Sequence, residues 1–509
     1  MKIKLNHIIS IIILLATIQY FMVSVSSPIV FGDEGYYAST AKWLSENNII
    51  PKYLPLQQNI VYKTKFTIKP LFIMTETFFF YFGELAVKLM FPIFSVLSAY
   101  LIYLLLSSYK EKQAGLLAAI SLLTIPSFIT YGVMGYTDTA LIMFTLLSII
   151  FIKKSFETNK KIHILLAGIF MASALLTKIS AMFLGVFIIL YTIKDFDKQK
   201  LKKMILILLI FALVMSPWII RNIILFSDTC YQFFALNPEA CEAEFFAEIP
   251  KLEGLQFEGS MDKVGTNLDL ISFGLLNYSL FAHGLLITIL LLFGIGIMLK
   301  GNEKIKNLVT LLSISIFPII LLSTWRTEDT ARYMLPLVIP ISIIVGLALQ
   351  RTYEYFKKYN KYIAIGIVII LVIVMVSQAQ EKINTMSQVK QFSPGFIEGC
   401  DWIKENTPED AILFATYMHQ TKYQCYRRVD IARDKEEILL SNNDTSYEHL
   451  KLNGINYLII LEGLITTQKL SENYPVEFVN YVEGSNKFTL VYDNRPTRGT
   501  DGVRIYEIQ

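Results

Sequence analysis

The sequence predicts a polytopic α-helical membrane protein that carries a small α/β domain at its C-terminal end. Of its 509 residues, 54% are hydrophobic and only 17% are charged. Apolar runs close to the ~20 residues that cross a bilayer recur up to about residue 380, after which the hydrophobicity falls sharply. This composition excludes a disordered chain, which needs low hydrophobicity and high net charge. The balance of 46 Lys+Arg against 42 Asp+Glu, a net charge of +4, also argues against a nucleic-acid-binding protein.

The apolar runs predict about eleven transmembrane helices. Their residues are 7–30, 85–107, 113–132, 136–152, 161–177, 179–193, 203–220, 270–299, 307–324, 333–349 and 362–379. The apolar segment 70–83 is too short to span comfortably and indicates a juxtamembrane or re-entrant helix. We interpret the first run as a retained helix, and not as a signal peptide, because it is long and no small-x-small cleavage site precedes Gly32.

The loops between these helices predict the orientation. With the N-terminus in the cytoplasm, every inter-helix loop on that side is basic, and the short outer loops carry far fewer cations. One lysine from each of these five loops is Lys112, Lys160, Lys200, Lys304 and Lys358. An odd number of helices then places the tail outside. We therefore expect a transmembrane module over 1–380 and an extracytoplasmic domain over 381–509.

The outer segments contain two long loops besides this tail, at 31–69 and 221–269. In the tail, 396–406 has helical spacing and ends at Thr407-Pro408, a helix stop signal. Two short apolar runs follow, at 411–415 and 457–461. Three further segments alternate as strands do: 478–482, 488–492 and 503–508. These patterns predict a small α/β domain.

The four cysteines all fall in predicted outer segments. Cys230 lies near Cys241, and Cys400 lies near Cys425, so two disulfides by region are plausible outside the membrane. Four unpaired cysteines fit the spacing equally well. No CxxC motif or Cys/His cluster indicates structural zinc.

Carboxylates stand at the outer boundary of the membrane in two places. Asp33 and Glu34 follow the first helix, and Asp138 begins an apolar helix. Each fits an ordinary N-terminal helix cap or first turn. A carboxylate at the edge of the bilayer is costly, however, and such a residue is a candidate for function. Because both sites face the same side, they could share one cleft.

Cations occur in the same layer. Lys69 precedes Pro70, where the chain re-enters the membrane, and Arg326 and Arg332 flank a short outer loop. A lone lysine there usually extends toward lipid headgroups, and the loop arginines could form simple ion pairs. Guanidinium is nonetheless the preferred bidentate ligand of phosphate. His283 lies within an apolar run, where a buried neutral histidine is a commoner role than a metal ligand.

Carboxylates and cations in one boundary layer suit a substrate with a lipid tail in the bilayer and a phosphate at its surface. The cations would hold the phosphate, and a carboxylate would take the proton of an attacking nucleophile. The observations so far do not fix the reaction.

The order of these motifs resembles the GT-C glycosyltransferases. The matching features are the first helix followed by Asp33-Glu34, then Lys69-Pro70-Leu71, then Asp138 two helices on, and Arg332-Tyr333-Met334-Leu335-Pro336 near the last helices. The resemblance extends over about 1–380. It is strongest to the protein O-mannosyltransferases and the bacterial lipid A aminoarabinose transferases, although Lys-Pro-Pro is commoner in the family than Lys-Pro-Leu.

The resemblance implies a donor sugar on a polyprenyl or dolichyl phosphate and a role for each matching residue. Asp33 would be the general base, and Glu34 would orient it or contact the acceptor. Asp138 would line the same cleft, and Lys69 and Arg332, with Arg326 nearby, would bind the donor phosphate. No cofactor is required. A divalent metal is conceivable near Asp33, Glu34 and Asp138, or at His283.

The predicted function is therefore transfer of a sugar, with inversion, to an extracytoplasmic protein, lipid or glycan. An oligosaccharide transferase is the nearest alternative. A transporter or flippase of lipid-linked substrates would use the same charges, but such proteins tend to show repeated halves and broken midplane helices, and neither is evident. A non-catalytic scaffold would leave Lys69 and Asp138 unexplained.

Overall fold

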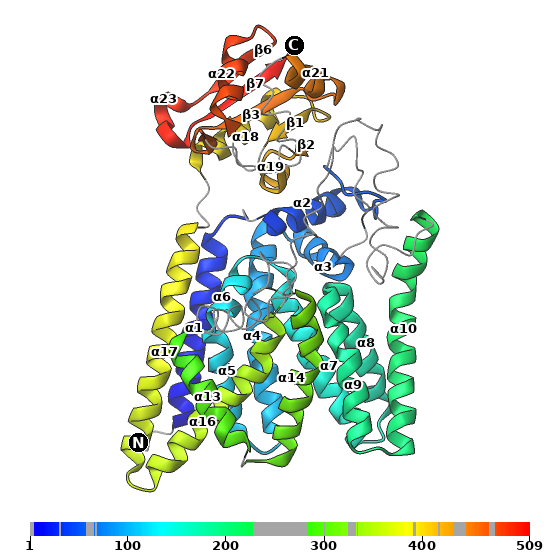
Figure 1. Ribbon diagram of the computed structural model, residues 1–509, viewed down its shortest axis with the longest axis vertical. Helices are drawn as coiled ribbons and strands as arrows, with labels where there is room; N and C mark the ends of the chain where they lie inside the picture. Colours follow the sequence, from blue (N-terminus) through cyan, green and yellow to red (C-terminus); the bar gives the residue numbers. More distant parts are fainter. Residues whose placement is uncertain are drawn as a thin grey trace.

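The computed structural model shows a bundle of long helices with a small sheet-containing domain at one end (Figure 1). The structure describes residues 5–29, 32–56, 66, 69–226, 284–299, 301–323, 332, 334–389, 393–415, 418–431, 444–467 and 474–509. The protein is mostly helical, and its strands are confined to the C-terminal domain apart from one isolated bridge residue at Tyr53. The predicted fold class is confirmed.

The helices of the membrane module run between its two ends. They are α1 (Leu5–Ser26), α4 (Glu84–Ser107), α5 (Lys112–Thr124), α6 (Pro126–Val133), α7 (Thr137–Glu157), α8 (Lys161–Thr177), η1 (Ile179–Met182), α9 (Phe183–Lys194), α10 (Lys198–Phe226), α13 (Leu285–Leu299), α14 (Glu303–Ser323), η4 (Leu335–Leu337), α16 (Val338–Lys357) and α17 (Lys361–Val389). Every predicted apolar span coincides with a helix or a helix pair wherever the structure describes it. Two shorter helices, α2 (Gly32–Asn47) and α3 (Pro70–Phe80), lie across the end that faces the C-terminal domain (Figure 1).

Within the described residues, six helices are long and apolar enough to cross a membrane. A seventh span results if α5 and α6, which meet at an angle of 63°, count as one. The break falls at Ile125, which is extended because the residue before a proline is disfavoured in a helix. The protein is therefore a multi-pass membrane protein. The number eleven remains a prediction, because several other apolar helices are shorter than a full span.

The helices of the bundle pack closely where small residues meet. Gly346 of α16 is one such position, because a Cβ atom there would lie 2.7 Å from the Ala114 carbonyl oxygen of α5. Small residues let helix backbones approach in this way inside membranes. The contacts of α5 with α4 and α16, and of α7 with α8, form the centre of the module that supports α2 and α3.

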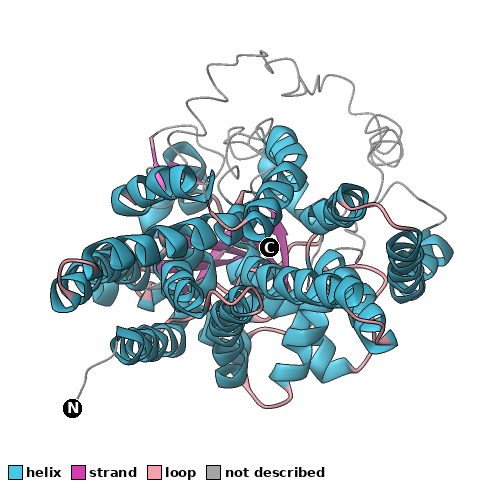
Figure 2. Cartoon of the chain, turned by 90° about the horizontal axis from the view of Figure 1, so that it is seen from below, coloured by secondary structure: helices cyan, strands magenta, loops and turns pink. Residues whose placement is uncertain are grey.

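The C-terminal domain is built on a five-stranded sheet of order β2-β1-β3-β7-β6. The strands β1, β2 and β3 are parallel, and β7 pairs antiparallel with both β3 and β6. Its elements are α18 (Pro394–Asn406), β1 (Ile412–Ala415), α19 (Met418–Cys425), β2 (Arg428–Ile431), α21 (Asp444–Leu452), β3 (Tyr457–Leu461), η5 (Glu462–Leu464), β4 (Ile465–Thr466), β5 (Tyr474–Pro475), α22 (Val476–Gly484), β6 (Phe488–Asp493), α23 (Arg495–Arg498), η6 (Gly499–Asp501) and β7 (Val503–Ile508). Figure 2, seen from the opposite end of the molecule, shows the strands behind the helix bundle.

One predicted strand of this domain is wrong. Residues 478–482 lie in the helix α22, in which Phe478, Val479 and Val482 are buried. These positions share one face of a helix, but in so short a window the same residues also fit the alternation of a strand. The helical face packs into the core formed by Phe414, Leu458 and their neighbours.

A disulfide joins Cys400 of α18 to Cys425 of α19. This is one of the two pairings considered from the sequence. The other, between Cys230 and Cys241, falls outside the residues that the structure describes. Because Cys400 and Cys425 are buried, the disulfide is a fixed link within the domain core.

Candidate active site

The candidate site begins with α2, which carries Asp33 and Glu34 in its first turn. The dipole of a helix favours acidic residues at this position. Asp33 and Tyr37 are one turn apart, so they lie on the same face, and the Tyr37 hydroxyl donates to Asp33 Oδ2 at 3.1 Å. Below this face the Tyr37 ring packs edge-on against Phe72 of α3 at 5.3 Å. Asp33 is therefore held at the junction of two helices.

Lys69 approaches Asp33 from the start of α3. Its φ of 52° places it in the left-handed region, and Pro70 occupies the first turn of the helix. A non-glycine residue in this conformation is uncommon, and such strain often occurs at functional sites. The Lys69 ammonium lies 3.8 Å from Asp33 Oδ2, donates to the Tyr37 hydroxyl and stands 4.6 Å from the centre of the Tyr37 ring.

Arg332 connects Asp33 to Asp138. Its Nη1 donates to Asp33 Oδ2, and its Nε donates to Asp138 Oδ2 at 3.0 Å. The guanidinium also stacks 4.3 Å from the centre of the Tyr136 ring. Asp138 is fully buried in the first turn of α7. The structure thus brings together Asp33, Lys69, Asp138 and Arg332, four residues that are far apart in the sequence.

Lys178 completes this network, and the sequence interpretation missed it. Its ammonium donates to Asp138 Oδ1 at 2.5 Å. Lys178 occupies the turn between α8 and η1, and its side chain is only 5% exposed. A signal was present in the sequence, since a lysine alone in a short predicted outer turn departs from the rule that cations gather inside.

The network carries more positive than negative charge. Asp33 and Asp138 stand against Lys69, Lys178 and Arg332, an excess of one positive charge that suits an anionic ligand. A guanidinium has five N–H donors. The contacts of Arg332 with Asp33, Asp138 and Tyr37 use three, which leaves two N–H groups without a partner among the described part of the chain.

The surroundings alter the acidity of the two residues that lie outside the membrane spans. Burial would raise the pKa of Asp33, but the charges of Lys69 and Arg332 outweigh burial and lower that pKa to about 2. Burial lowers the pKa of Lys69 to about 8, against the opposing effect of Asp33. Asp33 is therefore ionised at neutral pH, and Lys69 is close to losing its proton.

Glu34 lies deeper than Asp33, with 1% of its surface exposed. Gly135, whose φ is +68°, lets the turn before α7 approach it, because a Cβ atom there would stand 2.7 Å from Glu34 Oε1. Glu76 of α3 is also completely buried, and neither of its carboxyl oxygens has a hydrogen-bond partner among the residues that the structure describes. Burial, with a smaller effect of Glu34, raises the pKa of Glu76 well above its usual range.

Arg221 at the end of α10 holds the loop that leads to Lys69. Its guanidinium donates to the carbonyl oxygens of Phe66 at 3.0 Å and Pro51 at 2.6 Å, and it stacks 4.5 Å from the Trp218 ring centre. The sequence interpretation did not single out Arg221. Two other candidates, Arg326 and His283, lie outside the described residues.

The carboxylates of the network do not fit a divalent metal in this arrangement. Both oxygens of Asp138 and one of Asp33 already accept from cations. Across the described ranges, no group of three or more His, Cys, Asp or Glu side chains is placed to hold a metal ion.

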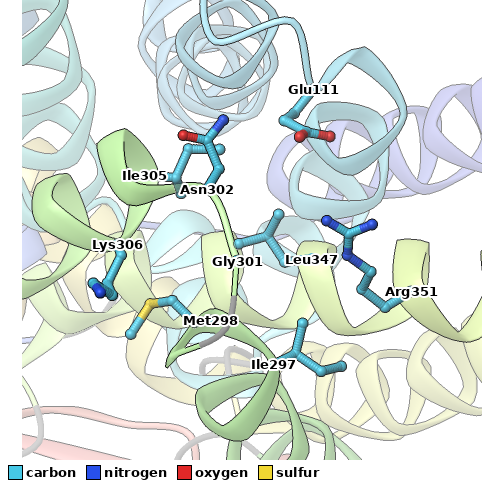
Figure 3. Close-up of a pocket in the computed structure, with 9 residues that line it drawn as sticks. All are labelled: Glu111, Ile297, Met298, Gly301, Asn302, Ile305, Lys306, Leu347 and Arg351. Atoms are coloured by element: carbon cyan, nitrogen blue, oxygen red, sulfur yellow. The ribbon is translucent and has the colours of Figure 1, made fainter.

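A small pocket lies at the opposite end of the membrane module and not at this network. Glu111, Asn302, Lys306 and Arg351 contribute its polar lining (Figure 3). Its volume of about 10 Å³ is roughly what one water molecule needs. This pocket is too small for a substrate.

The fold resembles two known membrane enzymes. ArnT from Cupriavidus metallidurans in the apo state matches with a TM-score of 0.66 and 12% identity, over 98% of this chain and 97% of that chain. ArnT bound to undecaprenyl phosphate matches with a TM-score of 0.63 and 11% identity, over the same shares. The oligosaccharyltransferase AglB from Archaeoglobus fulgidus, in complex with an inhibitory peptide and a dolichol-phosphate, matches with a TM-score of 0.62 and 11% identity, over 89% of this chain and 69% of that chain.

A family model adds evidence at the level of sequence. Residues 69–220 match the family described as dolichyl-phosphate-mannose-protein mannosyltransferase. No curated protein has a significant match to the chain. The oligosaccharyltransferase from Archaeoglobus fulgidus has also been solved with Zn and sulfate.

Over residues 69–220 the sequence thus resembles the dolichyl-phosphate-mannose-protein mannosyltransferase family, and over nearly its whole length the chain shares the fold of ArnT. The matched segment runs from Lys69 into α10, as far as residue 220, and includes Asp138 and Lys178. Residue roles do not follow from this similarity.

Proposed function

We propose that the protein transfers a sugar from a polyprenyl- or dolichyl-phosphate donor to an acceptor hydroxyl or amine at the end of the membrane that faces the C-terminal domain. The observation that carries this proposal is the contact of Asp33 with both Lys69 and Arg332. The arrangement sets a base beside two cations that suit a phosphate, at the boundary of a helical membrane module.

The chemistry needs few groups. The acceptor atom attacks the anomeric carbon, the bond from that carbon to the phosphate oxygen breaks, and the phosphate leaves with the bonding electrons. Asp33 takes the acceptor proton. Lys69 and Arg332 stabilise the charge that grows on the leaving phosphate, so that no acid need protonate it. Attack opposite the leaving group inverts the anomeric configuration.

The shared contacts give the donor a second effect. Without donor, Lys69 and Arg332 lower the pKa of Asp33, which makes this carboxylate a weak base. A phosphate bound to the same two cations would offset part of their charge, and the proton affinity of Asp33 would rise. Asp33 would thus become an effective base when the sugar to be transferred is in place.

Asp138 and Lys178 serve this arrangement from the buried side. Asp138 accepts a hydrogen bond from the Nε of Arg332. The Nη1 of the same guanidinium is then placed to donate to Asp33. Lys178 balances the remaining charge of Asp138. Glu34, one residue from Asp33, would orient it or contact the acceptor.

The similar proteins support this substrate class. ArnT was solved with undecaprenyl phosphate, and AglB with a dolichol-phosphate and a peptide. By analogy, the partners here would be a lipid-linked sugar and a protein, lipid or glycan acceptor. We also propose that the N-terminus is cytoplasmic and the C-terminal domain extracytoplasmic, as the basic loops predict.

The test compares the intact protein with Asp33→Asn in lipid nanodiscs, using polyprenyl-phosphate sugars as donors and membrane extract as the acceptor source. We expect transfer to fall by about 10²–10⁴-fold, because amide cannot accept the proton. Asp195→Asn is the matched control, since Asp195 is paired with Lys200 at the other end of the module. Thermal unfolding confirms that each variant is folded.

Equal transfer by Asp33→Asn and the intact protein would remove Asp33 from the chemistry. No transfer by any of these proteins with any donor would favour a transporter of lipid-linked substrates, which flux assays in vesicles would then detect. Repeating the assay with EDTA and with added Mg²⁺, Mn²⁺ or Zn²⁺ tests metal dependence directly.

Oligosaccharide transfer is the second candidate, because the fold also matches AglB. The two reactions differ in the donor, which is a lipid monophosphate for a single sugar and a lipid pyrophosphate for an oligosaccharide. A pyrophosphate carries more charge than the single excess cation of the network balances. We therefore expect preference for the monophosphate donor in a direct competition.

A further inference from the structure

The helix α2 lies between the ion-pair network and the C-terminal domain. Figure 1 shows α19 directly over α2, with α3 on its other side. Both packing contacts are extensive. Asp33 and Tyr37 face the network, while Gly35 is two positions from each and therefore about 200° around the helix. The helix α2, which carries the proposed base Asp33, is thus supported on its opposite face by α19 of the C-terminal domain.

The contact at Gly35 is too close for any side chain. A Cβ atom there would stand 2.7 Å from the carbonyl oxygen of His419 and 3.0 Å from its carbonyl carbon. The neighbouring Tyr36 ring packs edge-on against the His419 ring at 5.4 Å. Since the opposing atoms at Gly35 are backbone, they cannot rotate away.

Further contacts continue along the same side of α2. The Lys42 ammonium lies 4.4 Å from the Tyr426 ring centre, and the Tyr426 hydroxyl donates to Glu46. Beyond the ends of α2, Gln424 donates to the Ile29 carbonyl at 3.3 Å, and the Val429 amide donates to the Leu56 carbonyl at 3.2 Å. These contacts fix α2 along its whole length.

The disulfide secures α19 in this position. Cys425 is the last residue of α19, and Cys400 belongs to α18, which follows the long membrane helix α17. We call α19, on which α2 rests, the seat of α2. The Cys400–Cys425 link therefore ties this seat to α18.

We propose that α19 is a positioning element of the active site, which sets the place of Asp33 by supporting α2 from the opposite face. The claim that this affects sugar transfer rests on the proposed function, but the support of α2 by α19 does not. Lys69 and Arg332 lie outside α2, so the donor site would persist without the seat. Loss of the seat should lower kcat more than donor affinity.

Gly35→Ala tests the proposal with the least change, and Gly366→Ala is its matched control, because a Cβ atom at Gly366 in α17 meets nothing within 4 Å. We expect Gly35→Ala to lower kcat by about 10- to 100-fold, the usual result of displacing a reacting group by about 1 Å. The Kd for polyprenyl phosphate, measured in the same nanodiscs, should change by less than about twofold. Gly366→Ala should change neither.

The double variant Cys400→Ala/Cys425→Ala tests the seat from the other side. Hydrogen exchange of the α2 amides gives a readout that needs no activity. Exchange should speed up in Gly35→Ala and in the double variant, and should remain unchanged in Gly366→Ala.

Unchanged α2 exchange and unchanged kcat in Gly35→Ala would overturn the proposal. A parallel loss of kcat and donor affinity would overturn it as well, since that pattern indicates general damage to the site. If the intact protein transfers no sugar, the proposed function fails, whereas faster α2 exchange in both variants would still establish the seat.

Discussion

The two ends of the membrane module hold the same kinds of charged residue in different arrangements. At the end that faces the C-terminal domain, ion pairs join residues 40, 194 and 299 positions apart, and Asp138 at their centre is completely buried. At the opposite end, the pairs Lys153–Glu157, Glu303–Lys306 and Arg351–Glu354 each lie three or four positions apart on one helix. One partner of each of these pairs is at least 39% exposed.

Each charged pair at the opposite end lies within a single helix, where it serves solubility. The charged residues of the buried network meet only because the chain is folded. Exposed pairs one turn apart contribute little to stability. Charges in the buried network cost several kcal/mol each to remove from water, and their attraction need not repay that cost. Because these charges come from five separate segments and their burial need not add stability, the network points to a role in binding or chemistry.

We expect the two ends to differ most in the free energy of unfolding that is lost when one carboxylate is removed. Asp138→Ala removes the buried carboxylate that accepts from both Lys178 and Arg332 while their charges stay buried, so we expect a loss of about 3–5 kcal/mol. Glu354→Ala removes one partner of the Arg351–Glu354 pair, in which both side chains are at least 39% exposed, and should cost less than about 1 kcal/mol. Thermal unfolding of both variants in the same lipid measures this, and similar changes in Tm would contradict the comparison.

A smaller effect is expected at glycines of the two ends. Gly135→Ala places a Cβ atom 2.7 Å from Glu34 Oε1 and forces an alanine to keep a φ of +68°. We expect a loss of about 1–3 kcal/mol and reduced transfer. The control is Gly296→Ala in α13, where a Cβ atom meets nothing within 4 Å. An unchanged Tm in Gly135→Ala would show that the turn before α7 can move away.

The affinity for the donor is also expected to depend on pH, through the protonation of Lys69. Because burial lowers the pKa of Lys69 to about 8, its ammonium is charged below that pH and becomes neutral as the pH rises through it. The affinity for polyprenyl phosphate should therefore fall by about fivefold between pH 8 and pH 9, and by nearly tenfold per pH unit above that, if the neutral amine does not bind. Lys69→Arg keeps its charge and should remove this fall. Titration of Kd from pH 7 to pH 10 tests both expectations, and an equal slope in the two proteins would exclude Lys69 from the donor site.

The membrane helices could be predicted from the sequence because lipid imposes a simple rule on length and polarity. The rule does not show where a span is bent: Pro126 divides one predicted span into α5 and α6 at Ile125. The C-terminal domain is governed by tertiary packing, and there the segment 478–482 was assigned to a strand although it forms α22. A five-residue window cannot distinguish the two periods.

Residues of the network were partly visible in the sequence because charge at the edge of a bilayer is unusual. Asp33, Lys69, Asp138 and Arg332 could be singled out in this way, whereas their roles remain proposals. Lys178 was missed because a single lysine beside a helix end usually extends toward headgroups. The seat at Gly35 could not be predicted, since its partner is a backbone carbonyl of His419 that no residue pattern reveals.

The seat also sets an order of events during biosynthesis. The helix α2 leaves the ribosome early, but Tyr426, whose hydroxyl donates to Glu46 of α2, is 380 positions further along the chain. At 5–20 residues per second, synthesis of that interval takes roughly 20–80 s. Once Arg332 has been synthesised, the nascent protein has both cations of its donor site, but until α19 (Met418–Cys425) follows it lacks the support that places Asp33. A chain synthesised past Arg332 but not yet to α19 would therefore bind a lipid phosphate but transfer its sugar poorly. Full activity would require the C-terminal domain, which is synthesised last.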